Sequence, residues 1–64
     1  MKRYLAYCDA IKFLDDRGFS LNKTLNFTES PLVKKFEYWA KDDGEEMYLL
    51  EVMDQDFVFM FKLV

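Results

Sequence analysis

The last part of the chain constrains the fold most, because two strongly apolar stretches lie there with a short polar break between them. Residues 45–53 read EEMYLLEVM, residues 57–64 read FVFMFKLV, and Asp54, Gln55 and Asp56 separate them. Both stretches are rich in aromatic and branched residues, which favour strands. We therefore expect an antiparallel hairpin over residues 45–64.

The turn of this hairpin predicts its register. A tight turn at Gln55-Asp56 gives three apolar pairs, which are Val52 with Phe59, Leu50 with Phe61 and Tyr48 with Leu63. This register places one apolar parity of both strands on a single face of the sheet.

Residues 32–41, LVKKFEYWAK, can be interpreted in two ways. As a helix, the segment would have Ser30 as its N-cap and Pro31 at its first position. As a strand, it would join residues 45–53 through a loop at residues 42–44, with Gly44 in the left-handed bulge position. The strand predicts the pairs Lys41–Glu45, Trp39–Met47, Tyr38–Tyr48, Phe36–Leu50 and Lys35–Glu51. Two of these pairs carry opposite charges and the other three contain aromatic residues, so the strand is favoured.

The start of the chain predicts a helix over residues 2–17. Leu5, Cys8, Ile11 and Leu14 recur at helical spacing. Gly18 follows where a left-handed residue ends many helices, and Phe19 comes next, placed to contact Leu14.

Residues 19–28 alternate between apolar and polar, as in a half-buried strand. An uncovered strand over residues 57–64 would invite aggregation, so we expect residues 19–28 to pair with it. The strands would then lie side by side in the order 32–41, 45–53, 57–64 and 19–28. The alternative is that another chain pairs with residues 57–64, either in a dimer with a continuous sheet or by strand addition onto a partner.

The fold class expected from these elements is α+β. One N-terminal helix would pack on a small antiparallel sheet of three to four strands, in a single small domain over residues 1–64. The alternative is an αβαββ arrangement in which residues 31–42 are helical.

This sheet has more apolar surface than one helix can cover. The face expected to meet the helix contains Phe36, Tyr38, Tyr48, Leu50, Val52, Phe57, Phe59, Phe61 and Leu63. The opposite face contains Trp39, Met47, Leu49, Met53, Val58, Met60 and Val64, crossed by Lys35, Glu37, Lys41, Glu51 and Lys62. A contiguous apolar patch of this kind is typical of an interaction site. The alternative is that another segment of the chain folds over it.

The composition disfavours several classes of protein. The 64 residues carry a net charge of −3, whereas nucleic-acid-binding domains usually carry a basic excess. The chain has no histidine, and its single cysteine cannot form an internal disulfide. No secretory signal or membrane-spanning stretch is recognisable, so we expect a cytoplasmic location.

We do not expect an enzyme. The sequence has no catalytic triad pattern and no glycine-rich phosphate loop. Its paired acidic residues lack the ligand spacing of a metal-binding loop. We therefore predict no catalytic residues, no metal site, no cofactor and no small-molecule substrate.

The function expected is a small protein-binding module that acts by occupying a partner's surface. Its composition fits an inhibitor of a host defence or transcription protein, encoded by a phage or mobile element. The predicted anchors are Trp39, Met47, Met53 and Met60. The charged contacts around them are Lys35, Glu37, Lys41 and Glu51, and Glu45 and Glu46 would meet a basic partner.

Two alternatives remain. The protein could be a homodimeric structural or accessory subunit that buries its surplus face against its own copy. It could also bind single-stranded nucleic acid weakly by stacking next to a basic strip. The residues for that role are Tyr4, Tyr7, Trp39, Lys2, Arg3, Lys34 and Lys35.

Overall fold

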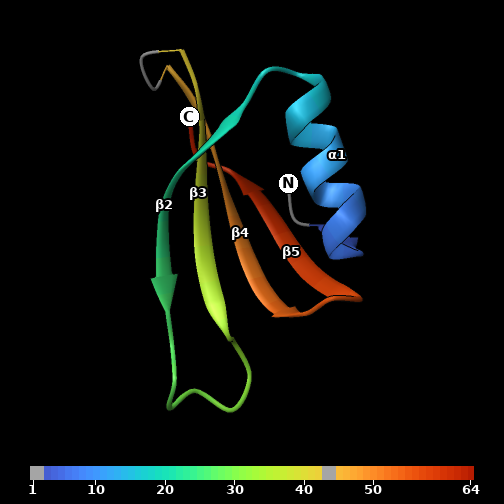
Figure 1. Ribbon diagram of the computed structural model, residues 1–64, viewed down its shortest axis with the longest axis vertical. Helices are drawn as coiled ribbons and strands as arrows, with labels where there is room; N and C mark the ends of the chain where they lie inside the picture. The colour runs from blue at the N-terminus through green and yellow to red at the C-terminus, as the bar shows by residue number, and fades with distance from the viewer. Residues whose placement is uncertain (1–2, 43–44) are drawn as a thin grey trace.

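The structure of the protein is a computed structural model that describes residues 3–42 and 45–64; Lys2, Asp43 and Gly44 lie outside the described residues. Its elements, in chain order, are β1 (Arg3–Leu5), α1 (Tyr7–Asp16), β2 (Ser20–Asn26), β3 (Lys35–Lys41), β4 (Glu46–Asp54) and β5 (Phe57–Lys62) (Figure 1). The strands form one antiparallel sheet in the order β1-β5-β4-β3-β2. The predicted α+β class, with an N-terminal helix on a small antiparallel sheet, is confirmed.

Residues 35–41 form a strand, so the alternative with a helix over residues 31–42 is wrong. The helix near the start of the chain is shorter than expected, because it begins at Tyr7 rather than at residue 2. The residues before it form β1, whose three residues pair with Met60, Phe59 and Val58 of β5. The backbone N–H of Tyr7 donates to the carbonyl oxygen of Gln55 at 2.7 Å, which ties the start of α1 to the turn between β4 and β5.

The end of α1 follows the prediction. Gly18 has a φ of +82°, a left-handed conformation that glycine adopts easily. The N–H of Phe19 donates to the carbonyl of Leu14 at 2.9 Å, and the N–H of Gly18 donates to that of Asp15 at 3.0 Å. These two bonds form a Schellman motif, which turns the chain from the helix toward β2.

The predicted strand order is wrong. The strand expected over residues 19–28 is β2, and it pairs with β3 at the far edge of the sheet instead of with β5. The connection between them is local: the N–H of Phe27 donates to the carbonyl of Lys34 at 2.9 Å, which closes a wide loop. The edge of β5 is paired with β1 instead.

Both predicted hairpin registers are wrong by one residue. Trp39 pairs with Tyr48 rather than with Met47, and Leu50 pairs with Met60 rather than with Phe61. In the hairpin between β3 and β4, Lys41 pairs with Glu46, whereas the predicted three-residue loop would pair it with Glu45. In the hairpin between β4 and β5, the pairing is irregular between Val52 and Asp54. Because side chains alternate between the faces of a strand, this shift turns β3 and β5 over relative to the prediction.

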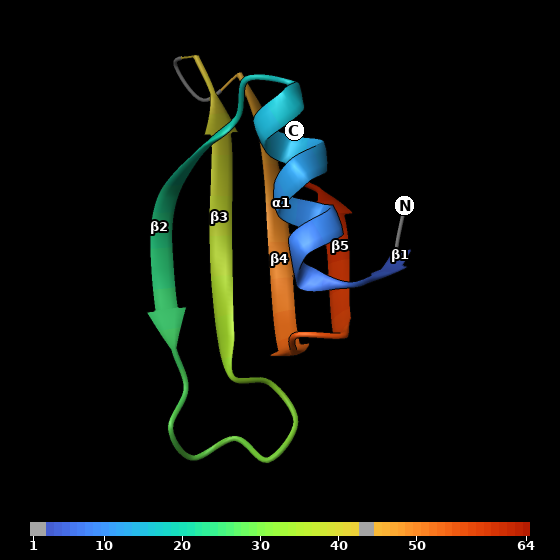
Figure 2. The same ribbon diagram turned by 45° about the vertical axis from the view of Figure 1, so that its right-hand side comes forward.

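The core lies between α1 and the sheet. Its buried apolar residues are Ala10, Leu14, Phe19, Trp39, Leu50, Val52, Val58 and Met60. Figure 2 shows α1 lying across the part of the sheet formed by β4 and β5. β2 runs along the outer edge, and all seven of its residues are exposed.

Candidate protein-binding face

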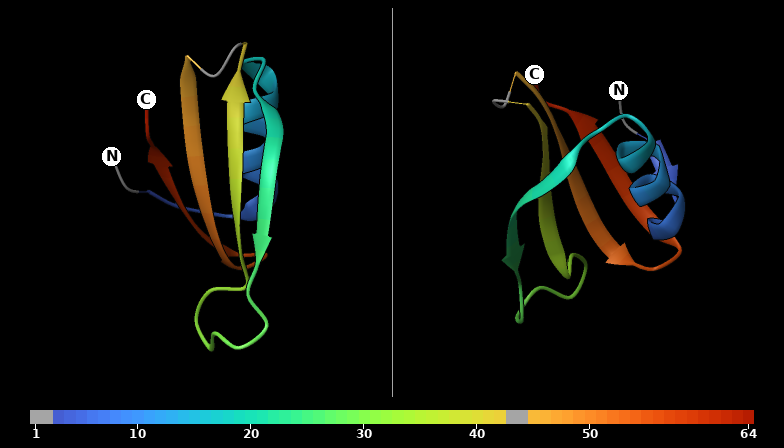
Figure 3. Two further views of the ribbon diagram at one scale, coloured as in Figure 1. Left: turned by 90° about the vertical axis from the view of Figure 1, so that its left-hand side faces the viewer. Right: turned by 45° about the horizontal axis from the view of Figure 1, so that its top comes forward.

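The side of the sheet away from α1 carries a row of large apolar side chains, which we call the outer face. Its apolar members are Leu25 from β2, Phe36 and Tyr38 from β3, Met47, Leu49 and Met53 from β4, and Phe57, Phe59 and Phe61 from β5. Figure 3 shows α1, the one helix in the described part of the chain, on the opposite side of the sheet. The loop of residues 27–34 extends beyond the end of the sheet instead of folding over this face.

The strand register aligns these residues in rows across the sheet. Lys23, Tyr38, Leu49 and Phe61 form one row, and Leu25, Phe36, Glu51 and Phe59 form the next. Directly opposed side chains in antiparallel strands lie close together on one face, so each row is continuous. Each member is partly or largely exposed, and Phe57 is 42% exposed.

Aromatic contacts link neighbouring members of the outer face. The ring of Phe59 lies 5.5 Å from that of Phe57 and 6.4 Å from that of Phe61. At the other edge, Phe27 meets Phe36 edge to face at 4.8 Å. The outer face therefore has one aromatic cluster along β5 and a second at β3, with Leu49 and Glu51 of β4 between them.

The predicted site residues fall into different parts of the structure. Met47, Met53 and Glu51 lie on the outer face and are partly exposed, where the sequence placed them. Glu45 is exposed beside the hairpin of β3 and β4, and Glu46 lies 3.9 Å from the amine of Lys41 and 4.0 Å from that of Lys62. Lys35, Glu37 and Lys41 lie on the helix side of the sheet, away from the outer face.

The predicted exposure of Trp39 and Met60 is wrong. Trp39 is 7% exposed and Met60 is 3% exposed, and both belong to the core. The reason is the shift in register, which turns these side chains toward α1 and brings Phe36, Phe59 and Phe61 to the outer face instead. The nucleic-acid alternative relied on an exposed Trp39, so it loses its main stacking residue.

The sequence contained one signal for these missed residues. In residues 57–64, the odd-numbered and the even-numbered positions are both mainly apolar. Whichever set enters the core, the other set therefore places apolar side chains on the opposite face of the sheet. The sequence pattern does not show which set enters the core.

On the side of the sheet that faces α1, Glu37 forms a buried polar cluster with neighbouring side chains. It is 2% exposed, and its carboxylate accepts hydrogen bonds from the hydroxyl of Tyr7 at 2.7 Å and from Nε1 of Trp39 at 2.9 Å. The amine of Lys35 lies 2.9 Å from the same carboxylate. The cluster therefore joins α1 to β3 and satisfies the buried charge.

The same contacts shift three pKa values. Burial alone would raise the pKa of Glu37, but the hydrogen bonds from Tyr7, Lys35 and Trp39, together with the positive charge of Lys35, outweigh it and lower the pKa below its ordinary value. The hydrogen bond to Glu37 raises the pKa of Lys35. Burial, followed by the hydrogen bond to Glu37, raises the pKa of Tyr7.

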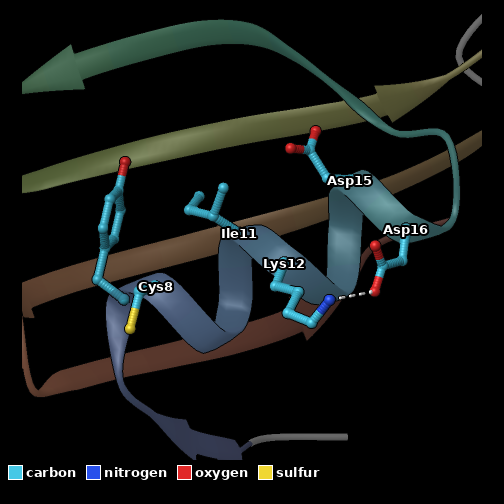
Figure 4. Close-up of a pocket in the computed structure, with 6 residues that line it drawn as sticks. Cys8, Ile11, Lys12, Asp15 and Asp16 are labelled. Carbon is cyan, nitrogen blue, oxygen red and sulfur yellow. Dashed lines mark hydrogen bonds and ion pairs between the residues drawn. The ribbon is translucent and has the colours of Figure 1, made fainter.

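Surface hollows lie near α1. One of about 520 Å³ follows the helix and is lined by Tyr7, Cys8, Ile11, Lys12, Asp15 and Asp16. In Figure 4 the Lys12 amine and the Asp16 carboxylate meet there in an ion pair of 3.2 Å. A second, of about 250 Å³, is lined by Tyr7, Lys34, Lys35, Val52, Asp54 and Gln55. A third, of about 260 Å³, is lined by Tyr7, Cys8, Gln55 and Asp56. Every buried side-chain nitrogen and oxygen in the described residues has a hydrogen-bond partner.

Within residues 3–42 and 45–64, no group of three or more acidic or cysteine side chains is arranged to hold a metal ion. The helix that the structure describes is too short and too polar to cross a membrane.

Comparisons with protein-family models, with curated proteins and with solved structures find no match to this chain. The functional proposal therefore depends on the geometry of the outer face.

Proposed function

We propose that this protein is a protein-binding module whose binding surface is the outer face. The observation that carries the proposal is the two neighbouring rows of side chains on the outer face. Tyr38 and Leu49 belong to one row and Phe36 to the other, and all three side chains are partly exposed on the side of the sheet away from α1. Monomeric soluble proteins rarely expose contiguous apolar patches larger than a few hundred Å², and larger patches are typical of interaction sites.

The composition of the outer face supports a protein as the binding partner. Aromatic residues and methionine are enriched in the centres of protein interfaces, whereas charged residues are depleted there. Methionine side chains, here Met47 and Met53, adapt to partners of different shape. Covering one Leu or Phe side chain contributes roughly 1.5–3 kcal/mol when it is fully removed from water.

The mode of action we propose is occupation of the partner's surface. We further propose that the protein comes from a phage or mobile element and that its partner is a defence or transcription protein of the host. The support for this part of the proposal is the composition of the chain, which is small, acidic and free of histidine.

The test is capture of a partner from nuclease-treated lysate, followed by binding of the purified partner to three forms of the protein. These forms are the wild type, Leu49→Lys on the outer face, and the control Leu32→Lys, whose side chain is 74% exposed in the loop before β3. We expect stoichiometric binding by the wild type and the control, and a loss of at least about tenfold in affinity for Leu49→Lys. Equal binding by all three forms would show that the outer face is not the binding surface.

A further inference from the structure

We propose that the occupant of the outer face is a second copy of this chain. The two sheets then pack face to face, and the α1 helix of each copy lies on the side of its sheet away from the interface. This inference rests on the proposed function, because both use the outer face. The resulting homodimer has four layers, with the two sheets about 10 Å apart and their strands within about 30° of each other.

The charges of the outer face favour a second copy. In the two central rows of this face the charged residues are Lys23 and Glu51, one of each sign, and the next charge is Asp54, which pairs with Phe57 at the exposed end of β4. Two central rows without net charge meet their own copy with little electrostatic repulsion, although the whole chain carries a net charge of −3. Burying these rows also removes few charges from water, which keeps the desolvation penalty low.

The area of the outer face is close to what a specific dimer requires. Four strands about 4.8 Å apart and about seven residues long, at about 3.3 Å per residue, cover roughly 440 Å² in projection. Two copies therefore bury roughly 900 Å² before the relief of the side chains is added, which is near the lower limit of roughly 1,000 Å² for a specific interface. The side-chain relief of rings such as Phe36 and Phe61 adds to the projected area.

The size of the chain also favours self-association. The chain has 64 residues, and its described core contains eight buried apolar residues. Domains below about 70–80 residues often need a further source of stability, such as a metal, disulfides or oligomerisation. The single cysteine excludes an internal disulfide, and a second sheet stacked on the outer face supplies a second apolar layer.

In such a two-fold dimer the same patch is used by both copies. Tyr38 and Leu49 are register partners in the middle of the sheet, so they lie close to the symmetry axis. A lysine at position 49 would then bring two positive charges together in the centre of the interface, which is strongly unfavourable.

The test is sedimentation equilibrium of the purified chain over a wide range of concentration. We expect the wild type to have twice the 7.7 kDa mass of one chain and to dissociate on dilution. Leu49→Lys should raise the dimer dissociation constant by about 100-fold, whereas Leu32→Lys should leave it unchanged. Fluorescence of the buried Trp39 shows whether each variant is folded. Phe61→Lys, at the end of the same row on β5, provides a second variant if Leu49→Lys does not fold.

The outcomes separate this inference from the proposed function. A wild-type dimer that is lost in a folded outer-face variant supports the inference. A wild type that stays monomeric at every concentration overturns it, as does a dimer that persists in both folded variants. If the monomeric wild type still captures another protein that Leu49→Lys does not capture, the proposed function stands and only the second copy is excluded.

Discussion

At the scale of single residues, Glu37 is the most unusual side chain in the structure. A carboxylate that is 2% exposed is unfavourable unless it is paired and hydrogen-bonded, and Tyr7, Trp39 and Lys35 together meet that requirement. The cluster also explains how Trp39 can be buried, since its indole N–H has an acceptor inside the core. One charged residue therefore determines the position of an aromatic residue on β3 and of the first residue of α1.

The cluster predicts how stability depends on pH. The pKa of Glu37 is lower in the folded protein than the value of about 4.3 expected when unfolded. The stability that Glu37 contributes is therefore present above about pH 4.3 and is lost as the pH falls through the lower, folded-state pKa. Urea unfolding should show the wild type losing stability on acidification more steeply than Glu37→Gln, which cannot ionise.

The control for this prediction is the same comparison at neutral pH. There, Glu37→Gln should be less stable by about 1–3 kcal/mol, because a hydrogen-bonded charge has been replaced by a neutral amide. If the difference between the two proteins stays constant from about pH 7 to about pH 3, Glu37 is not the group responsible.

At the scale of elements, the orientation of β3 decides which of its side chains lie on the outer face. Its pairing with β4 turns Trp39 and Glu37 toward α1, and it leaves Phe36 and Tyr38 on the outer face. The alternating burial along the strand reflects this arrangement. The candidate site exists in its present form because of this register.

The register predicts that neighbouring aromatic residues on β3 differ in their effect on stability. Trp39→Ala should destabilise the protein by about 3–5 kcal/mol, because a large buried side chain leaves a cavity. In the monomer, Tyr38→Ala removes a partly exposed side chain and should destabilise the fold by about 1 kcal/mol. Chemical denaturation of both variants at concentrations where the chain is monomeric measures the difference, and a larger effect for Tyr38→Ala would favour the register expected from the sequence.

At the scale of the whole molecule, the two edges of the sheet are formed by different kinds of strand. β5 has its outer edge paired with β1, whereas β2 lies at the opposite edge with every residue exposed. β2 is mostly polar on the side where α1 packs, and its register with β3 is irregular between Leu21 and Lys23, a feature that discourages pairing with another chain. β5 is more apolar than β2, so an open edge at β5 would aggregate more readily, and the pairing with β1 covers this edge.

This arrangement predicts the effect of removing β1. A chain that starts at Ala6 should aggregate, because the apolar strand β5 would present unpaired backbone groups. Replacing Arg3–Leu5 with three threonines is the matched control, because threonine favours strands and keeps the backbone pairing. Size-exclusion chromatography at several concentrations distinguishes the two forms. An equally soluble truncated chain would show that β1 does not protect this edge.

The sequence by itself determined the elements that have a clear periodicity or a special residue. It predicted the strands β2 to β5, the end of α1 at Gly18 and Phe19, and the presence of two apolar faces on one sheet. These features follow from local patterns, since alternation defines a strand and a glycine with positive φ ends a helix. The sequence therefore predicted a second, partly apolar face, and it placed Met47, Met53 and Glu51 there correctly.

Only the tertiary structure decided which residues form that face. Residues 57–64 are apolar on both parities and the turn before them contains no glycine, so no local signal favours Phe59 or Met60 for the core. Packing in the core beneath α1 made that choice on β5, and the hydrogen bond between Glu37 and Tyr7 joins β3 to α1; both are long-range interactions. The short strand β1 was missed for a related reason: three residues carry too little periodicity, and their strand conformation depends on pairing with β5 at the other end of the chain.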